Sequence, residues 1–444
     1  MLTIGFLGGG NMAGALIGGL LSGGGDDVRV HVIDRHADKL ERLAALGAQA
    51  HLELGDWVTA CDLMGLAVKP QGMKEALAPV APPARLLPLA APLERALVLL
   101  DEARARGDGI VVAADGDPLF FGIGATLVRR WGVGAVRIHP APSCLQLACA
   151  RLGLPWHDVA AVSLHGRDSL HPFLAAAMRG RPFALLTDER TTPDVPARIL
   201  LDRGLAHFRV HVFENLGFAR ECRWEGTLSE AAGRRFGPAC TVLLLPEGRP
   251  RRPHPGLDAA GLVSDRGLMT KGPVRAAALS LLRPAPDAVF WDIGAGSGAV
   301  AIEAASLLPE GRVYAVERVP RRALDIQENR RRCGAANLHV VLGAAPDCLD
   351  ALPAPHAVFV GGGLSGGSAA ALLATLYDRL APGGRLAVAC VLLDSLAACR
   401  RSLRDLAPTP PVLLQIAAAE ARPLGADCHL AALNPVFLVM VEKA

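Results

Sequence analysis

A glycine-rich turn in the second half of the chain restricts the possible folds more than any other feature. The chain reads VFWDIGAGSG from Val289 to Gly298, an apolar run that leads into glycines at every second position. A helical run follows as far as Leu308. Glycine allows a tight turn and a close approach of a ligand to the backbone, and the helix behind it presents free N–H groups. The pattern predicts a strand, a binding turn and a helix, as in a doubly wound α/β fold.

An acid at the end of the predicted strand indicates which ligand the turn binds. A diphosphate is stabilised by a helix N-terminus, and Asp292 directly before the turn would oppose it. S-adenosylmethionine carries an ammonium and a sulfonium group instead, and an acid favours both charges. Glu317 ends the next predicted strand, about 20 residues further on, where ribose hydroxyls are usually bound. We expect S-adenosylmethionine to contact Asp292, Gly294, Gly296, Gly298 and Glu317; a glycine-rich turn beside unrelated surface acids is the alternative.

Three segments follow one another along the chain, and all three read as α/β. Residues 1–80 show a β-α-β-α-β pattern, which is the first half of a nucleotide-binding fold. Residues 81–248 alternate short apolar strands with helical stretches. Residues 249–266 include a run rich in arginine, proline and glycine and are expected to be a linker. Residues 267–444 contain seven predicted strands, most of them separated by helices, which suits a Rossmann-like sheet covered on both faces.

Motifs of the last segment resemble the decarboxylating precorrin methyltransferases of cobalamin biosynthesis. They read LMTKGPVR at 268–275, GAAP at 343–346, VFVGGG at 358–363 and RPLG at 422–425. The resemblance implies a class I methyltransferase domain in which Ala344 and Ala345 also lie beside the cofactor. The substrates of that family carry many carboxylates. Lys271, Arg275 and Arg422 are candidates to pair with them, because ion pairs of arginine with carboxylates are strong and directional. For each of the three, a solvated surface charge is the alternative.

The middle segment resembles the tetrapyrrole, or class III, methyltransferases. Its motifs are GDPLFFG at 116–122, HPAPS at 139–143, SLHGR at 163–167 and LTD at 186–188. Glycine and proline make a loop rigid, so its carbonyl groups can face the polar end of S-adenosylmethionine; an ordinary turn is the alternative. The resemblance implies cofactor contacts at Gly116, Asp117, Pro118, Ser143 and Thr187. Relatives begin this domain with a strand and a GxGPG-type loop, and that opening is missing here.

The first segment carries different motifs in the place of that opening. They read GGGNMAG at 8–14, DR at 34–35 and AVKPQ at 67–71. They resemble the nucleotide-binding half of pyrroline-5-carboxylate reductase, in which Arg35 would favour NADPH. The resemblance stops near Val80, so we do not expect a complete reductase. The segment is then an inactive relic, a module that binds a dinucleotide without reducing anything, or a structural substitute for the missing opening. The last possibility requires strand Thr3–Leu7 to pair with Val111–Ala114 or another strand of the class III sheet.

A class III domain followed by a class I domain resembles the precorrin-6Y C(5,15)-methyltransferase (decarboxylating) family. The resemblance implies methylation of precorrin-6B at C-5 by the class III domain and at C-15 by the class I domain. It also implies that the class I domain removes carbon dioxide from the acetate side chain of ring C. Two alternatives stay open: only the C-terminal centre is active, or the chain is an NADPH-dependent oxidoreductase similar to pyrroline-5-carboxylate reductase.

Composition argues against several other functions. The net charge is +3, and no basic face with interleaved aromatics is visible, so we expect no nucleic-acid partner. No apolar run reaches the roughly 18 residues of a membrane span. The ten cysteines form no CxxC pair and the histidines no HExxH motif, so we expect no metal site and reduced thiols in the cytoplasm. Relatives of the C-terminal domain suggest a possible homo-oligomer.

Overall fold

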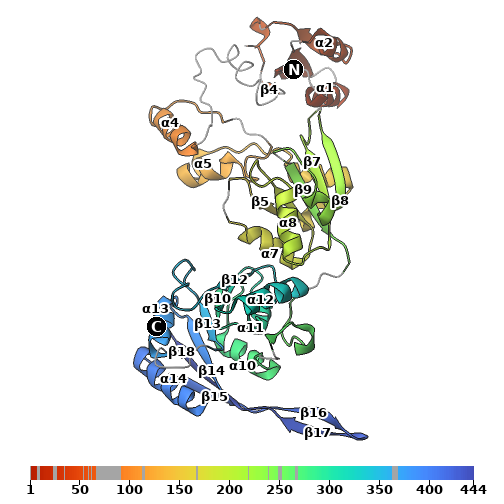
Figure 1. Ribbon diagram of the computed structural model, residues 1–444. Coiled ribbons are helices and arrows are strands. Elements are labelled where there is room, and N and C mark those ends of the chain that lie inside the picture. The colour runs from red at the N-terminus through yellow and green to blue at the C-terminus, as the bar shows by residue number, and fades with distance from the viewer. Residues whose placement is uncertain are drawn as a thin grey trace. The chain divides into compact units, whose positions relative to one another are not determined.

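The computed structural model divides into two compact units, residues 1–143 and residues 144–444, and each is described by itself (Figure 1). The structure describes the chain except for residues 1, 8–10, 24–27, 35, 54, 59, 62, 67–91, 113–115, 167–168, 219, 239, 249–252, 266–268 and 363–368. The expected α/β class is confirmed, because each of the three segments forms its own sheet with helices packed against it.

The first unit opens with a small parallel sheet in the order β3-β2-β1-β4. Its elements are β1 (Leu2–Leu7), α1 (Asn11–Gly23), β2 (Val28–Ile33), α2 (Ala37–Ala44), β3 (Gln49–His51) and β4 (Leu63–Leu66). Apolar side chains of the strands and both helices, among them Phe6, Ile17, Val32 and Leu40, form a separate core. The predicted strands and helices are present as β1, α1, β2, α2 and β4, and the short strand β3 lies between α2 and β4 in addition.

Strand β1 does not replace the missing opening of the class III domain. It pairs with β2 and β4, and among the described residues these three strands and β3 make up a sheet of their own. Residues 111 and 112, the described part of the expected strand Val111–Ala114, are not in a strand. The reading of residues 1–80 as a structural substitute therefore loses its support. Helices α4 (Leu93–Ala105) and α5 (Ile123–Trp131) complete the unit and pack through Leu100 and Leu127.

The second unit begins with a mixed five-stranded sheet in the order β5-β6-β9-β7-β8. Its strands are β5 (Ala160–Ser163), β6 (Phe183–Leu186), β7 (Phe208–Glu214), β8 (Cys222–Thr227) and β9 (Cys240–Pro246). Its helices are α6 (Cys144–Leu152), α7 (His171–Arg179), α8 (Asp194–Asp202) and α9 (Leu228–Ala232). Only β5 and β6 run parallel, and the other pairs are antiparallel.

A seven-stranded sheet follows in the order β12-β11-β10-β13-β14-β18-β15, which confirms the predicted number of strands. Its strands are β10 (Val289–Ile293), β11 (Arg312–Glu317), β12 (Leu338–Leu342), β13 (Ala357–Val360), β14 (Arg385–Cys390), β15 (Val412–Ile416) and β18 (Val436–Glu442). The first five in this order are parallel, and β18 is antiparallel to both of its neighbours. The strand order reverses between β10 and β13, and ligands of doubly wound folds bind at the carboxyl ends of strands at such a point.

Helices cover both faces of this sheet (Figure 1). They are α10 (Gly272–Leu282), α11 (Ala299–Leu307), α12 (Pro320–Cys333), α13 (Ala369–Arg379) and α14 (Leu393–Leu406). Every residue of β10 is buried, and its side chains alternate between the two faces. Phe290 belongs to the core under α10, α11 and α12, whereas Trp291 belongs to the core under α13 and α14. A continuous apolar run is the pattern expected of a strand covered on both sides.

A two-stranded hairpin between β15 and β18 was not predicted from the sequence. It consists of β16 (Ala419–Leu424) and β17 (Asp427–Ala432), and it extends from the seven-stranded sheet as an arm (Figure 1). Nearly all of its residues are exposed, including Leu424 and Leu430.

Candidate cofactor site

The glycine turn after β10 has a backbone that other residues adopt only with strain. Gly294, Gly296 and Gly298 have φ angles of +70°, +59° and +78°. A Cβ atom on Gly298 would lie 2.8 Å from Cγ2 of Ile326, and one on Gly294 would lie 3.1 Å from the backbone of Gly362. Both the backbone angles and the lack of space therefore require glycine at these positions. Helix α11 begins directly behind the turn.

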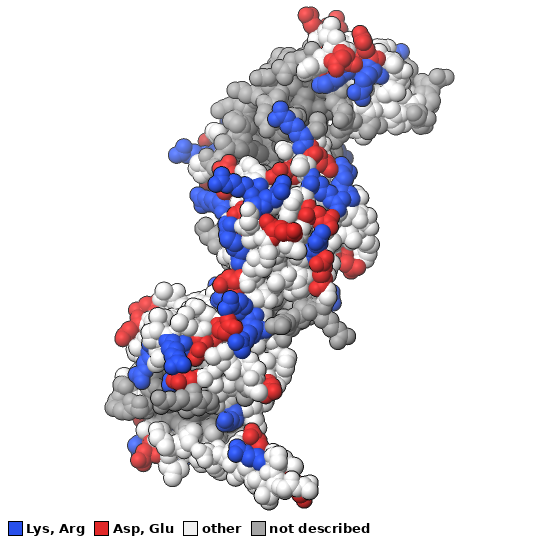
Figure 2. All heavy atoms as spheres, turned by 45° about the vertical axis from the view of Figure 1, so that its right-hand side comes forward, with Lys and Arg blue, Asp and Glu red and all other residues white. Residues whose placement is uncertain are grey.

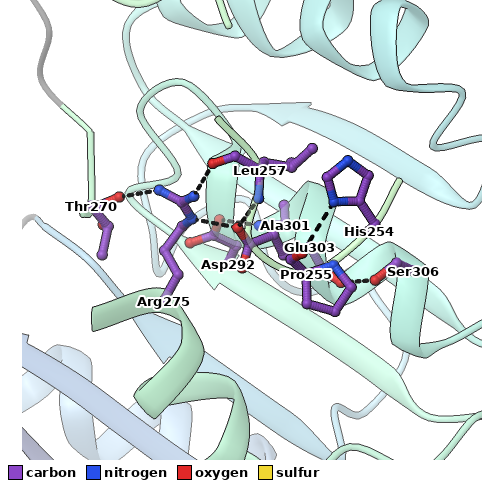
Figure 3. A network of polar contacts seen from close by, with 9 residues as sticks. All are labelled: His254, Pro255, Leu257, Thr270, Arg275, Asp292, Ala301, Glu303 and Ser306. Atoms are coloured by element: carbon purple, nitrogen blue, oxygen red, sulfur yellow. Dashed lines mark hydrogen bonds and ion pairs between the residues drawn. The ribbon is translucent and has the colours of Figure 1, made fainter. Parts of the chain in front are cut away.

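Asp292 lies in β10 at the base of this turn and is only 1% exposed. Its Oδ2 accepts a hydrogen bond of 3.0 Å from the backbone N–H of Ala301 (Figure 3). Burial, together with the nearby charge of Glu317, raises the pKa of this carboxyl from 3.8 to about 7, although the bond from Ala301 opposes the shift. A cation that binds next to such a buried carboxyl stabilises its charged form and lowers its pKa again.

Glu317 stands at the end of β11 and supports the same turn. Its Oε2 accepts a hydrogen bond of 2.9 Å from the N–H of Gly296, and its Oε1 accepts one of 3.0 Å from the N–H of Val319. The side chain is 4% exposed. Each carboxylate oxygen has a further lone pair, so these two bonds leave acceptor capacity for a ligand.

The GAAP stretch lies at the same edge of the sheet. Strand β12 pairs with β11 up to Glu317, and the N–H of Gly343 then donates to the carbonyl oxygen of Glu317 at 3.0 Å. Ala344 is exposed and Ala345 half-buried. The structure thus places the glycine turn, both acids and this stretch at the carboxyl ends of adjacent parallel strands, where the sequence predicted a common site.

Arg275 is buried, and Figure 3 shows its guanidinium directed at Thr270, Leu257 and Glu303. It is 1% exposed, and its Nε donates to Oε1 of Glu303 at 2.8 Å. Its two terminal nitrogens donate to the carbonyl oxygens of Thr270 and Leu257, each at 2.7 Å. Glu303 also accepts from the N–H of Leu257 at 3.0 Å. The arginine therefore holds the segment before α10 against α11, which differs from the substrate contact expected from the sequence.

We predict that Arg275→Met lowers the free energy of unfolding by about 3–5 kcal/mol, because Glu303 is then left buried without its counter-charge. Lys271→Met is the matched control: Lys271 is exposed, so its replacement should change stability by no more than about 0.5 kcal/mol. The measurement is urea denaturation, monitored by hydrogen exchange of the backbone amides of β10. These amides report the unfolding of this domain and not that of the rest of the chain. A loss below about 1 kcal/mol for Arg275→Met would contradict the structural role.

The other two basic candidates occupy different places. Lys271 precedes α10 and is exposed at its N-terminus. Arg422 lies on β16, opposite His429 of β17, and is exposed on the hairpin. The three basic side chains predicted to act on one substrate are therefore found in three different environments.

The GDPLFFG motif forms a turn that is closed by its own polar groups. Oδ1 of Asp117 accepts from the N–H of Leu119 at 2.8 Å, and Oδ2 accepts from the N–H of Ala141 at 3.4 Å. The second bond joins the turn to the HPAPS motif, in which Ser143 is buried. Gly116 has a φ of +65°, and the N–H of Gly124 donates to the carbonyl oxygen of Pro118 at 3.0 Å.

Thr187 follows β6 in the second unit and is 3% exposed. Its hydroxyl donates to the carbonyl oxygen of Cys240 and accepts from the N–H of the same residue, both at 3.2 Å. The next residue, Asp188, was not singled out from the sequence. Its carboxylate accepts from the N–H groups of Gly166 and Thr191 at 2.9 Å, and these and other bonds lower its pKa to about 2. Asp188 therefore joins the LTD and SLHGR motifs.

In the first segment, the glycine loop 8–10, Arg35 and the AVKPQ motif lie outside the described residues. Asp34 is described, and its carboxylate is engaged within the segment. It accepts a 2.9 Å bond from the N–H of His36 and lies 3.4 Å from Nζ of Lys39. The described residues give no support for NADPH.

Charges of both signs are interspersed over the described surface in the view of Figure 2, and no large patch of one sign stands out. Among the described residues, no helix has the length and apolar character needed to cross a membrane. The described residues also contain no group of three or more His, Cys, Asp or Glu side chains that could hold a metal ion.

Comparisons with known proteins match both methyltransferase segments. A family described as "Precorrin methyltransferase domain" matches residues 262–443, and one described as "Tetrapyrrole (Corrin/Porphyrin) Methylases" matches residues 40–232. The second match begins inside the segment that resembles a reductase. The chain is 36% identical over 342 residues to precorrin-6Y C(5,15)-methyltransferase [decarboxylating] of Sinorhizobium sp. The matched stretch covers 75% of this chain and 79% of that protein.

Two shorter relatives match separate parts. The chain is 36% identical over 175 residues to cobalt-precorrin-6B C(15)-methyltransferase (decarboxylating) of Salmonella typhimurium, covering 39% of this chain and 89% of that protein. It is 42% identical over 119 residues to cobalt-precorrin-7 C(5)-methyltransferase of the same organism, covering 27% of this chain and 58% of that protein. The C(15) relative is thus matched over nearly its whole length and the C(5) relative over little more than half.

Proposed function

Because the chain belongs to the precorrin-6Y C(5,15)-methyltransferase (decarboxylating) family, we propose that it methylates precorrin-6B at C-5 and C-15 and removes carbon dioxide from the ring C acetate. It is an S-adenosylmethionine-dependent enzyme of cobalamin biosynthesis. The observation in its own structure that supports this best is Asp292, a buried acid with a raised pKa directly below a glycine turn. Such a site fits a ligand with positive charge and disfavours a diphosphate.

S-adenosylmethionine supplies a methyl group that its sulfonium charge has already activated. In our proposal Asp292 stabilises the positive charge of the cofactor, and the three glycines let the backbone approach it closely. Glu317 accepts hydrogen bonds from the ribose while it continues to support Gly296. The protein then accelerates transfer chiefly by aligning the acceptor carbon with the methyl group and by excluding water.

The substrate carboxylates need cationic partners on the protein. We assign this role to the exposed side chains of Lys271 and Arg422 and exclude Arg275, whose donors are all directed at protein atoms. For the class III centre we propose cofactor contacts at Gly116, Asp117 and Pro118. The resemblance implies two further cofactor contacts, the buried residues Ser143 in the first unit and Thr187 in the second, and we propose each of them separately.

A second candidate is an enzyme in which only the C-terminal centre acts. Two observations favour it: residues 2–66 form a sheet of their own, and the C(5) relative is matched over 58% of its length against 89% for the C(15) relative. Such an enzyme would methylate C-15 and release carbon dioxide but leave C-5 unchanged.

Mass spectrometry of the product decides between the two. Full-length protein incubated with precorrin-6B and S-adenosylmethionine is expected to add two methyl groups and remove one carbon dioxide. One methyl group with loss of carbon dioxide would support the C-terminal centre alone. Unchanged substrate, under conditions in which a known relative turns over, would contradict both. Oxidation of NADPH with pyrroline-5-carboxylate, the reductase alternative, is expected to be absent.

We further propose that the chain forms a homo-oligomer and acts in the cytoplasm. An isolated two-stranded hairpin is only marginally stable in water, so the exposed arm β16–β17 is a candidate contact between copies. Light scattering should then give a mass above the 46.3 kDa of one chain. No disulfide joins the ten cysteines, all of which lie among the described residues, and this suits a reducing compartment; fractionation of the cells can check it.

A further inference from the structure

Asn329 of α12 connects the glycine turn to the segment that precedes the class I domain. The residue is 0% exposed. Its Nδ2 donates to the carbonyl oxygen of Ser297 at 2.9 Å and to that of Val263 at 2.8 Å, and its Oδ1 accepts from the N–H of Val263 at 2.8 Å. All of these contacts are with backbone groups, so they do not depend on which side chains stand at 263 and 297.

The bond to Ser297 fixes one peptide group of the turn. The carbonyl of Ser297 and the N–H of Gly298 belong to the same planar peptide unit, so holding one determines the direction of the other. The N–H of Gly298 donates to the carbonyl oxygen of Ala295 at 2.8 Å, which closes the turn. One turn earlier in α12, Ile326 packs directly below Gly298.

The turn is therefore held at consecutive residues by different elements. Glu317 of β11 binds the N–H of Gly296, and Asn329 of α12 binds the carbonyl of Ser297. Glu317 both supports the turn and is proposed to bind the ribose of the cofactor. Asn329 supports the turn alone.

The segment at the other end of Asn329 is fixed to the domain by further contacts. The N–H of Leu257 donates to Glu303 of α11, and Asp265 lies 3.1 Å from the guanidinium of Arg322 in α12. Residues 257–265, which the sequence predicted as part of a linker, thus pack against the helices behind the cofactor turn. Asn329 hydrogen-bonds both this segment, at Val263, and the turn, at Ser297.

We propose that Asn329 is a positioning residue of the S-adenosylmethionine site, which sets the orientation of the Ser297–Gly298 peptide and couples it to the segment 257–265. The inference rests on the proposed function, because it assigns the residue to the same cofactor site. Asn329 does not touch the cofactor in this proposal; it acts through the backbone of the turn.

Asn337 offers a matched control within the same domain. It is also an asparagine that is almost fully buried, at 1% exposed, and its Nδ2 donates to the carbonyl oxygens of Leu308 at 2.6 Å and Ala305 at 3.3 Å. Its own carbonyl accepts from Val313, near the amino-terminal end of β11, whereas the cofactor turn lies at the carboxyl-terminal end. Replacing either asparagine with aspartate removes the donors and leaves a residue of nearly the same size.

The test compares Asn329→Asp with Asn337→Asp in the full-length protein. Asn329→Asp should weaken S-adenosylmethionine binding, measured by calorimetry, about tenfold or more, because two backbone carbonyls lose their donor. Asn337→Asp should leave the affinity within about twofold of the wild type. The KM for S-adenosylmethionine should rise more than kcat falls, and hydrogen exchange at residues 294–301 and 257–265 should accelerate only in the Asn329 variant. Asn329→Ala, which removes the amide without adding a charge, should also weaken binding and serves if the aspartate variant does not fold.

Equal losses of affinity in the two aspartate variants would overturn the inference and leave the proposed function intact. Wild-type protein that binds no S-adenosylmethionine would overturn the proposed function and the inference with it.

Discussion

Replacing Asp292 with asparagine is expected to weaken S-adenosylmethionine binding about a hundredfold, because a buried charge next to a cationic ligand is removed. The same replacement should leave the ligand-free protein at least as stable as the wild type at pH 8. The wild-type carboxylate is then ionised and buried, and its described hydrogen bond comes from a backbone N–H and not from a cation. An amide of the same shape avoids the cost of burying that charge.

The dependence on pH gives a second readout of the same residue. The pKa of Asp292 is about 7 in the folded protein and 3.8 when exposed, so between these values the folded state retains a proton that the unfolded state has lost. The contribution of Asp292 to stability is therefore fully present below pH 3.8 and is lost as the pH rises towards 7. Binding of a cation requires the ionised form, so affinity should rise with pH up to about 7 and level off above it. In Asp292→Asn, neither the free energy of unfolding nor the affinity for S-adenosylmethionine should show this dependence on pH.

Asp287→Asn is the matched control, because Asp287 is exposed just before the opposite end of β10 and undergoes the same change in charge. Calorimetric titrations from about pH 6 to 8.5 should give wild-type affinity and wild-type pH dependence for this variant. Wild-type affinity in Asp292→Asn as well would contradict the site.

The parts of the site that are local in sequence could be predicted, and the parts that depend on distant contacts could not. The run from Val289 to Gly298 specifies strand, turn and helix within a few residues, and Glu317 follows at the end of the next strand. Arg275 stands in a motif that suggested a substrate contact. Its partner Glu303 is 28 residues away, and the sequence alone does not show that the two meet.

The hairpin and the buried Asn329 were also not predicted from the sequence. Hairpin β16–β17 is exposed on both faces, and Pro423 within β16 argues against a strand when the sequence alone is considered. Asn329 stands in the strongly polar stretch QENRRRC and resembles a solvated helix face there. It is buried where its amide meets the backbone of Val263 and of Ser297, and both residues are distant from it in the sequence.

Replacing Gly124 with alanine is expected to abolish methylation at C-5 while methylation at C-15 and decarboxylation continue. A Cβ atom on Gly124 would lie 2.7 Å from the carbonyl oxygen and 2.9 Å from the Cβ atom of Pro118, which is too close for either atom. The GDPLFFG turn would have to open, which would also disturb the 3.0 Å bond from the N–H of Gly124 to Pro118. A misplacement of about 1 Å can cost two orders of magnitude in rate, so C-5 methylation should slow at least a hundredfold. Mass spectrometry should then find one added methyl group in place of two.

Gly134→Ala is the control for this change. A Cβ atom on Gly134 would have no atom within 4 Å, and the residue is exposed, so this variant should still add both methyl groups. The pair of variants separates the two centres in one chain, because only the product methylated at C-15 and decarboxylated should accumulate in Gly124→Ala. Two methyl groups added at the wild-type rate in Gly124→Ala would show that this turn does not position the C-5 reaction. Loss of both methyl groups would show that the two centres are not independent.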